Sequence, residues 1–154
     1  MIPVQRLNHA VLYVRDVERS VAFYRSAFGF EVVDEVPGRA AFLRAAGTEN
    51  HHDLGLFAGG AGAPGPEPGR VGLYHLAREV GSIHDLAEAR RTLVELGALR
   101  GESDHGASKS LYAADPDGNE FEVMWAVPRS SWGTYEGQAV VAPLDLAAEI
   151  ARHG

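Results

Sequence analysis

The stretch "SLYAADPDGNEFEVMWAV", residues 110 to 127, decides how the fold of this chain of 154 residues is interpreted. Two segments rich in β-forming residues, 110–115 and 120–127, flank the sequence Pro116-Asp117-Gly118. Proline, aspartate and glycine in this order favour a tight turn between two strands. The stretch therefore predicts an antiparallel hairpin.

The residues before this hairpin predict a strand followed by a helix. Residues 71–80, "VGLYHLAREV", are typical of a strand, and Ser82 is a suitable helix N-cap with Asp85 three residues later. Apolar residues then follow at helical spacing until Gly97, namely Ile83, Leu86, Leu93 and Leu96.

The first part of the chain repeats this order. Residues 7–14 indicate a strand, and Asp16 caps a helix that ends at Gly29. Three further strands are expected at 30–36, 40–45 and 52–58. His9 lies seven residues before Asp16, and His75 lies seven residues before Ser82. We infer an α+β fold built from two copies of one βαβββ module.

These elements predict one domain and a tail. The domain covers residues 1–132, with module one at 5–58, a linker at 59–69 and module two at 70–127. The linker is mostly glycine and proline and lacks the Lys-Ser/Thr ending of a phosphate-binding loop. The tail, residues 133–154, contains a segment at 144–152 that favours a short helix.

The composition limits the classes of function. The net charge is -7 and the 14 Lys and Arg residues are scattered, so we expect no nucleic-acid partner. The chain has no cysteine, and a metal ion would therefore be bound by His, Asp or Glu. No apolar run approaches the roughly eighteen residues of a membrane span, and we expect a soluble cytoplasmic protein.

Three side chains at related positions form a candidate metal site. His9 and His75 occupy equivalent strands of the two modules, and Glu122 lies on the last strand among apolar neighbours. Two histidines and one carboxylate are the ligands of the 2-His-1-carboxylate triad, which leaves coordination positions open. Each side chain also has an alternative interpretation, as a hydrogen-bonded structural histidine or a solvated strand carboxylate.

From about Leu7 to Trp132 the chain resembles the vicinal oxygen chelate superfamily, and within it the extradiol ring-cleaving dioxygenases of the catechol 2,3-dioxygenase type. The motifs "GLYHLA", "SDHGASKSLYAADPDGNEFEV" and "PRSSW" carry the resemblance, whereas "DPDGN" alone is typical of the whole superfamily. The resemblance implies that the two modules form a half-barrel around a metal site.

The resemblance also implies a role for each candidate residue. His9, His75 and Glu122 match the Fe(II) ligands, although Mn(II) accepts the same ligand set. His52 matches the acid-base histidine, Tyr112 the substrate-binding tyrosine and His105 an additional pocket histidine. On a strand His52 shares a face with Leu54 and Leu56, so we expect it to line the cavity if they do. His84 and His153 receive no role.

The reaction implied is the opening of a catechol-type aromatic diol by O2. The best-known extradiol enzymes have four modules, so a chain of two modules is expected to form a homodimer or a higher homo-oligomer.

Three alternatives stay open. A glyoxalase-like isomerase needs a fourth ligand, usually Glu, on the strand at 52–58, where only His52 could serve. A fosfomycin-resistance thiol transferase needs a cationic pocket, and Lys109 is the only lysine of the second module. A drug-binding protein of this fold, as in bleomycin resistance, commonly lacks the three ligands that are present here.

Overall fold

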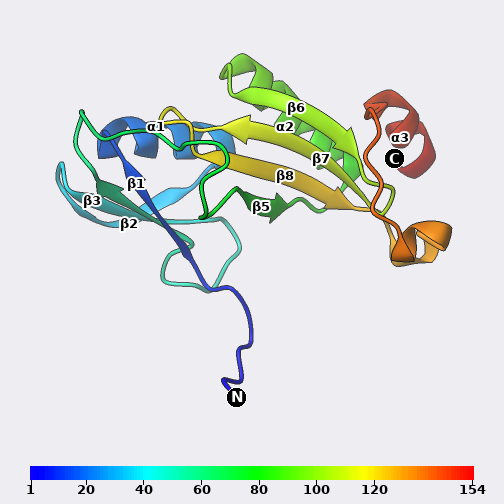
Figure 1. The fold of residues 1–154 in the computed structure, drawn as a ribbon, viewed down its shortest axis with the longest axis horizontal. Coiled ribbons are helices and arrows are strands. Elements are labelled where there is room, and N and C mark those ends of the chain that lie inside the picture. The colour runs from blue at the N-terminus through cyan, green and yellow to red at the C-terminus, as the bar shows by residue number, and fades with distance from the viewer. The chain divides into compact units, whose positions relative to one another are not determined.

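The computed structural model describes all 154 residues, with eight β-strands, three α-helices and two short 3-10 helices (Figure 1). The α+β prediction is therefore confirmed. The contacts divide the chain into two compact units, residues 1–65 and 66–154, and each contains one four-stranded sheet. None of the helices is both long enough and apolar enough to cross a membrane.

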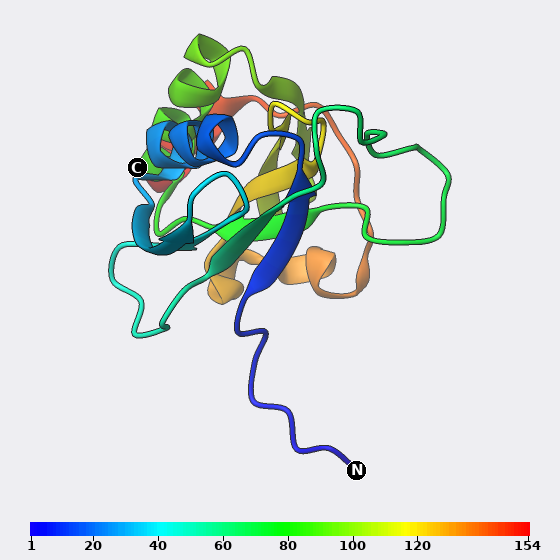
Figure 2. The same cartoon turned by 90° about the vertical axis from the view of Figure 1, so that its left-hand side faces the viewer.

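The first unit is a sheet with the strand order β1-β4-β3-β2 and one helix, α1. β1 runs parallel to β4, and the other neighbours are antiparallel. The elements are β1 (Ala10–Val14), α1 (Val17–Phe28), β2 (Glu31–Val36), β3 (Ala40–Arg44) and β4 (Leu54–Ala58). Residues 1–9 form no helix or strand and extend away from β1 (Figure 2).

Helix α1 begins and ends where the sequence predicts. The Asp16 side chain accepts a hydrogen bond from the Arg19 amide at 2.8 Å, and the chain leaves the helix at Gly29, whose φ of 66° favours glycine. Val17 and Tyr24 of α1 pack against the sheet in the core of this unit, together with fully buried Leu43, Leu54 and Leu56.

The second unit repeats this topology, with the strand order β5-β8-β7-β6 and β5 parallel to β8. Its elements are β5 (Leu76–Glu79), α2 (Ile83–Glu95), β6 (Leu99–Asp104), β7 (Ser108–Ala114) and β8 (Glu120–Ala126). The predicted hairpin is β7 with β8, paired from Ala114 with Glu120 to Ser108 with Ala126. The tail contributes the 3-10 helices η1 (Arg129–Ser131) and η2 (Gly133–Gly137), and α3 (Leu146–His153).

Both first strands are shorter than the sequence suggests. β1 begins at Ala10 and β5 at Leu76, so His9 and His75 each lie one residue before a strand. The parallel partners limit these strands, because Ala10 pairs with Leu54, where β4 begins, and Leu76 pairs with Phe121 near the start of β8. The sequence pattern also predicts no strand at the position of β6.

Candidate functional site

In the second unit, the side chains of His75 and Glu122 approach each other directly. His75 Nε2 lies 3.2 Å from Glu122 Oε2, and the two side chains are 25% and 12% exposed. Tyr112 on β7 pairs with Glu122 across the hairpin, and its ring centroid lies 5.8 Å from that of His75. Pairing of β7 with β8 thus brings a carboxylate and a phenol to one face of the sheet, and the imidazole of His75, one residue before β5, lies beside them.

His105 extends this cluster from the turn between β6 and β7. Its Nε2 lies 2.8 Å from the Tyr112 hydroxyl, and its Nδ1 lies 2.7 Å from the carbonyl oxygen of Val140 in the tail. Burial, and after it the negative charge of Glu122, raises the pKa of Tyr112. The Tyr112 phenol therefore stays protonated over the physiological pH range.

Two residues of this cluster were given no role from the sequence. Glu120 Oε1 lies 3.6 Å from His75 Nδ1, on the side of the ring opposite the nitrogen that faces Glu122. The charge of Glu120, and then its hydrogen bond with Tyr74, raises the pKa of the Tyr74 phenol. Glu120 has the same strand parity as Glu122 and could therefore have been found from the sequence, whereas adjacency to His75 gives no such signal for Tyr74.

In the first unit, His9 and His52 lie together. Their ring centroids are 4.6 Å apart, and His9 Nδ1 lies 2.9 Å from the Asn8 side-chain oxygen. His52 also contacts the Phe42 ring at 5.1 Å, and its Nδ1 lies 3.1 Å from that of His51. Burial, and after it the charge that His9 and His51 carry when protonated, lowers the pKa of His52. A neutral imidazole that can accept a proton is the result.

The strand-face argument for His52 is wrong, although His52 does contact His9. Leu54 and Leu56 are fully buried in the core rather than lining an open face. Because β4 begins at Leu54, side-chain alternation does not extend back to His52, which lies in the preceding loop.

A buried asparagine joins the segments that carry these two histidines. The Asn50 side-chain oxygen accepts hydrogen bonds from Arg6 and Asn8. Its amide donates to the Asn8 carbonyl oxygen at 2.9 Å and to Asp53 Oδ1 at 2.7 Å. Asn50 therefore connects the chain before β1 to the loop before β4, and these are the positions of His9 and His52.

The donors in the second unit suit a divalent metal ion. Two ligand atoms about 2.1 Å from an ion lie about 3.0 Å apart when they subtend a right angle at it, close to the 3.2 Å between His75 Nε2 and Glu122 Oε2. No group of three or more His, Asp or Glu side chains is arranged to hold an ion. His9 belongs to the first unit and the other two candidate ligands to the second, so the triad stays a prediction.

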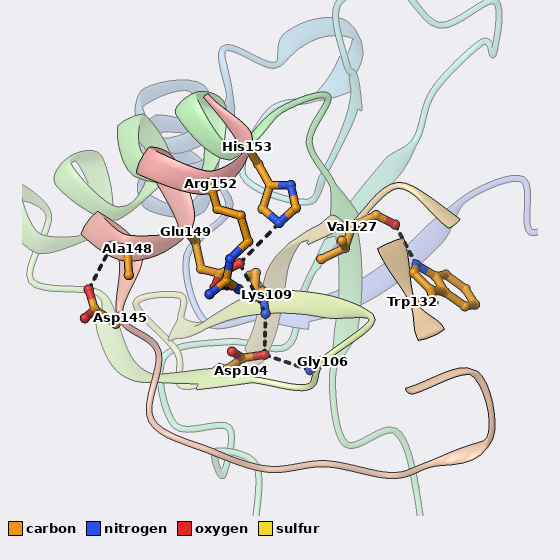
Figure 3. Close-up of polar contacts among 10 residues, drawn as sticks. All are labelled: Asp104, Gly106, Lys109, Val127, Trp132, Asp145, Ala148, Glu149, Arg152 and His153. Carbon is orange, nitrogen blue, oxygen red and sulfur yellow. Dashed lines mark hydrogen bonds and ion pairs between the residues drawn. The ribbon is translucent and has the colours of Figure 1, made fainter. Parts of the chain in front are cut away.

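Lys109 does not form the cationic pocket that a phosphonate substrate would need. Its side chain is 4% exposed, and its ammonium lies 2.5 Å from Asp104 Oδ1 and 3.4 Å from Glu149 Oε2 of α3 (Figure 3). Along β7 it alternates with Tyr112 and shares the core face with Leu111 and Ala113. The lysine is thus neutralised on the side of the sheet away from the cluster.

The family model that matches the chain covers residues 6–123 and describes the glyoxalase/bleomycin resistance protein/dioxygenase superfamily. The catechol-2,3-dioxygenase of Bacillus subtilis (strain 168) is 36% identical over 126 residues, which cover 82% of this chain and 43% of that protein. The chain thus spans less than half the length of this relative.

Two further relatives have names that state two different activities. The biphenyl-2,3-diol 1,2-dioxygenase 3 of Rhodococcus globerulus is 34% identical over 143 residues, covering 90% of this chain and 74% of that protein. The crystal structure of a lactoylglutathione lyase from Agrobacterium tumefaciens superposes with a TM-score of 0.61 at 27% identity, covering 80% of this chain and 96% of that one.

Proposed function

The chain belongs to the glyoxalase/bleomycin resistance protein/dioxygenase superfamily, and we propose that it acts there as an extradiol dioxygenase on a catechol-type diol with O2. The observation that carries the proposal is the second-unit cluster. A candidate ligand pair, His75 and Glu122, lies beside the hydrogen-bonded pair Tyr112 and His105. Relatives named catechol and biphenyl-diol dioxygenases support the same choice.

His9, His75 and Glu122 are the proposed ligands of Fe(II), and Mn(II) would fit the same donors. Bound there, the metal would supply adjacent open positions that gather and polarise the diol and O2. Glu120 Oε1 lies 3.6 Å from His75 Nδ1, and a carboxylate on that side of the ring favours the tautomer with hydrogen on Nδ1, which leaves the Nε2 lone pair free to bind a metal.

His52 is the proposed acid-base residue. Its lowered pKa keeps the imidazole neutral and able to accept a proton from a diol hydroxyl. Tyr112 is the proposed substrate-binding residue, because its hydroxyl is held by His105 on the face that carries Glu122. The chain's own contribution is thus to bind the diol, orient it and move one proton.

Two features argue against the other activities of the superfamily. β4 consists of Leu54, Gly55, Leu56, Phe57 and Ala58, and none of these supplies the fourth ligand of a glyoxalase-like isomerase. His52, in the loop before β4 and beside His9, is the one candidate for that ligand, and we assign it the acid-base role instead. The only lysine of the second module is buried in ion pairs, which leaves a fosfomycin-type phosphonate without that cation. A drug-binding protein that binds no metal would not need the three candidate ligands, all of which are present in this chain.

We also propose that the chain works as a homodimer or a higher homo-oligomer, since each of its two sheets is open and has edge strands that a second copy would cover. Light scattering during size-exclusion chromatography tests this directly. A mass of one chain at all concentrations would contradict it.

The test of the function starts from anaerobic purification with Fe(II) and measurement of bound metal. A panel of catechols is then assayed for O2 uptake and for a yellow ring-opened product. His75→Ala should lose both iron and turnover, whereas His84→Ala, at an exposed histidine with no assigned role, should keep both. His52→Ala should keep iron and slow turnover by about 10²-fold or more. Full iron and activity in His75→Ala would overturn the ligand assignment.

A further inference from the structure

The C-terminal tail lies along the end of β6 and reaches the histidine of the second-unit cluster. Asp104 and Ala142 exchange two backbone hydrogen bonds, of 2.8 and 2.9 Å. Two residues earlier in the tail, the Val140 carbonyl oxygen lies 2.7 Å from His105 Nδ1. The tail thus fixes both the backbone and one ring nitrogen of the turn that carries His105.

The Val140 contact determines which nitrogen of neutral His105 carries the hydrogen. A carbonyl oxygen can only accept a hydrogen bond, so His105 Nδ1 must be the donor. A neutral imidazole has one N–H, which leaves Nε2 with a lone pair. Nε2 lies 2.8 Å from the Tyr112 hydroxyl, so that hydroxyl must donate its only hydrogen to His105.

We propose that the tail is a positioning element of the site, which holds His105 in the Nδ1–H tautomer and thereby makes Tyr112 a hydrogen-bond acceptor toward the ligand. With its hydrogen committed to His105, the Tyr112 oxygen offers only lone pairs. It therefore selects a ligand group that still bears a hydrogen. If the ligand is the diol of the proposed function, on which this step rests, its oxygen next to Tyr112 remains protonated.

Close packing of the tail on the same turn supports this role. Gly106 has a φ of 74°, and a Cβ added there would lie 2.5 Å from atoms of the Tyr135 ring. The Gly106 amide also donates to Asp104 Oδ1 at 2.7 Å. The turn around His105 is therefore confined by the tail on the backbone, on the imidazole and at Gly106.

The first test measures the tautomer without any ligand. Full-length protein labelled with ¹⁵N-histidine is freed of metal with a chelator and studied by long-range ¹H–¹⁵N NMR, with His105→Asn used for assignment. We expect one His105 tautomer, with hydrogen on Nδ1 and none on Nε2. Hydrogen on Nε2 instead, or on both nitrogens at pH 8, would overturn the proposal.

A backbone variant tests the part played by the tail. Ala142→Pro removes the amide that donates to Asp104, and it should let the Nε2–H tautomer appear. Val141→Ser, at the exposed neighbouring residue, should leave the tautomer unchanged. If a folded Ala142→Pro protein keeps the wild-type tautomer, the tail does not select it. If this variant fails to fold, the wild-type spectrum still decides the tautomer and, with it, the acceptor role of Tyr112.

Ligand affinity tests the direction of the Tyr112 bond. In the Mn(II)-loaded protein, Tyr112→Phe should weaken catechol about tenfold, because an accepted hydrogen bond is lost. It should weaken the anion of 2-hydroxypyridine N-oxide, an O,O-chelator without a hydrogen on either oxygen, less than about twofold. Equal losses would overturn the acceptor role. The expected tautomer without turnover of any diol would instead remove the proposed function and leave the positioning by the tail intact.

Discussion

Replacing Lys109 with methionine tests whether the only lysine of the chain stabilises the fold or serves the site. The change keeps an unbranched side chain of similar length and removes a charge on a side chain that is 4% exposed, next to Asp104 and Glu149. Removing one member of a buried ion pair costs about 3–5 kcal/mol, because the partner charge stays behind. Asp104 is 25% exposed and Glu149 keeps Arg152 at 2.7 Å, so we expect the lower end, about 3 kcal/mol.

Urea unfolding measures this loss. With a slope of about 2 kcal/mol per molar urea, 3 kcal/mol moves the midpoint by about 1.5 M. Arg91→Met is the matched control, because the Arg91–Glu88 pair is 67% and 62% exposed. Exposed pairs of this kind contribute less than about 1 kcal/mol, so the midpoint of the control should move by under about 0.5 M.

The pH dependence gives a second readout of the same pair. Burial acts to raise the pKa of Asp104, but hydrogen bonds from Lys109 and the Gly106 amide, with the charge of Lys109 and the charge that His105 carries when protonated, hold it below its usual range. A lowered carboxyl pKa adds stability above the unfolded value of about 3.9 and loses it as pH falls through the folded value. The difference between wild type and Lys109→Met should therefore shrink below about pH 4.

Two results would refute this reasoning. The first is a shift of the urea midpoint of Lys109→Met at pH 7 that is no larger than the shift of the Arg91→Met control. The second is a folded Lys109→Met protein that loses its metal, since Lys109 lies on the face of β7 away from Tyr112 and Glu122.

Three further changes test single contacts. Glu122→Gln should lower the pKa of Tyr112 toward its ordinary value, because the negative charge of Glu122 is one cause of the raised pKa. The measurement is a ¹³C-tyrosine NMR titration, and an unchanged or higher pKa would contradict the prediction. Asn50→Ala should cost about 2 kcal/mol of unfolding free energy, because Asp53 and Asn8 lose a buried partner; a urea midpoint equal to that of wild type would refute it. Gly106→Ala should cost about 2 kcal/mol, because φ is 74° and the new Cβ would meet Tyr135, and a loss below about 0.5 kcal/mol would show that the turn relaxes freely.

The elements with strong local determinants could be predicted from the sequence. Asp16 and Ser82 both accept hydrogen bonds from amides three residues later, as expected of N-caps. The turn at Pro116-Asp117-Gly118 joins two strands whose alternation is clear, so β7 and β8 pair as expected. At these positions few local structures satisfy the hydrogen bonds of the backbone. The sequence pattern therefore predicts the structure.

Strand β6 could not be predicted in this way. Its sequence, Leu99 to Asp104, contains Gly101 and three charged residues, and the pairing with β7 shifts register between Leu99 and Gly101. A bulge interrupts the alternation on which the prediction of strands depends. The strand forms because β7 offers a free edge, which is a tertiary cause that a local pattern does not contain.

The candidate site also combines residues that the sequence predicts with contacts that depend on the tertiary structure. Residue types and spacing pointed to His75 and Glu122, and the family resemblance pointed to Tyr112, but the pairing of Tyr112 with His105 depends on how the β6–β7 turn folds back. The contact with Val140 lies 35 residues away in the sequence and uses a backbone carbonyl, which every residue has. No pattern of side chains could therefore have predicted it.

Two adjacent residues link the stability of the tail to the chemistry of the site. Asp104 binds Lys109 on the core side and exchanges backbone hydrogen bonds with Ala142, whereas His105 binds Tyr112 and the Val140 carbonyl. Because α3 is held through Glu149 by the same lysine, an element far from the cluster in sequence restrains the chain on which the His105 tautomer depends. A short tail on a two-module chain can thus set the direction of one hydrogen bond in the site without contributing a side chain to it.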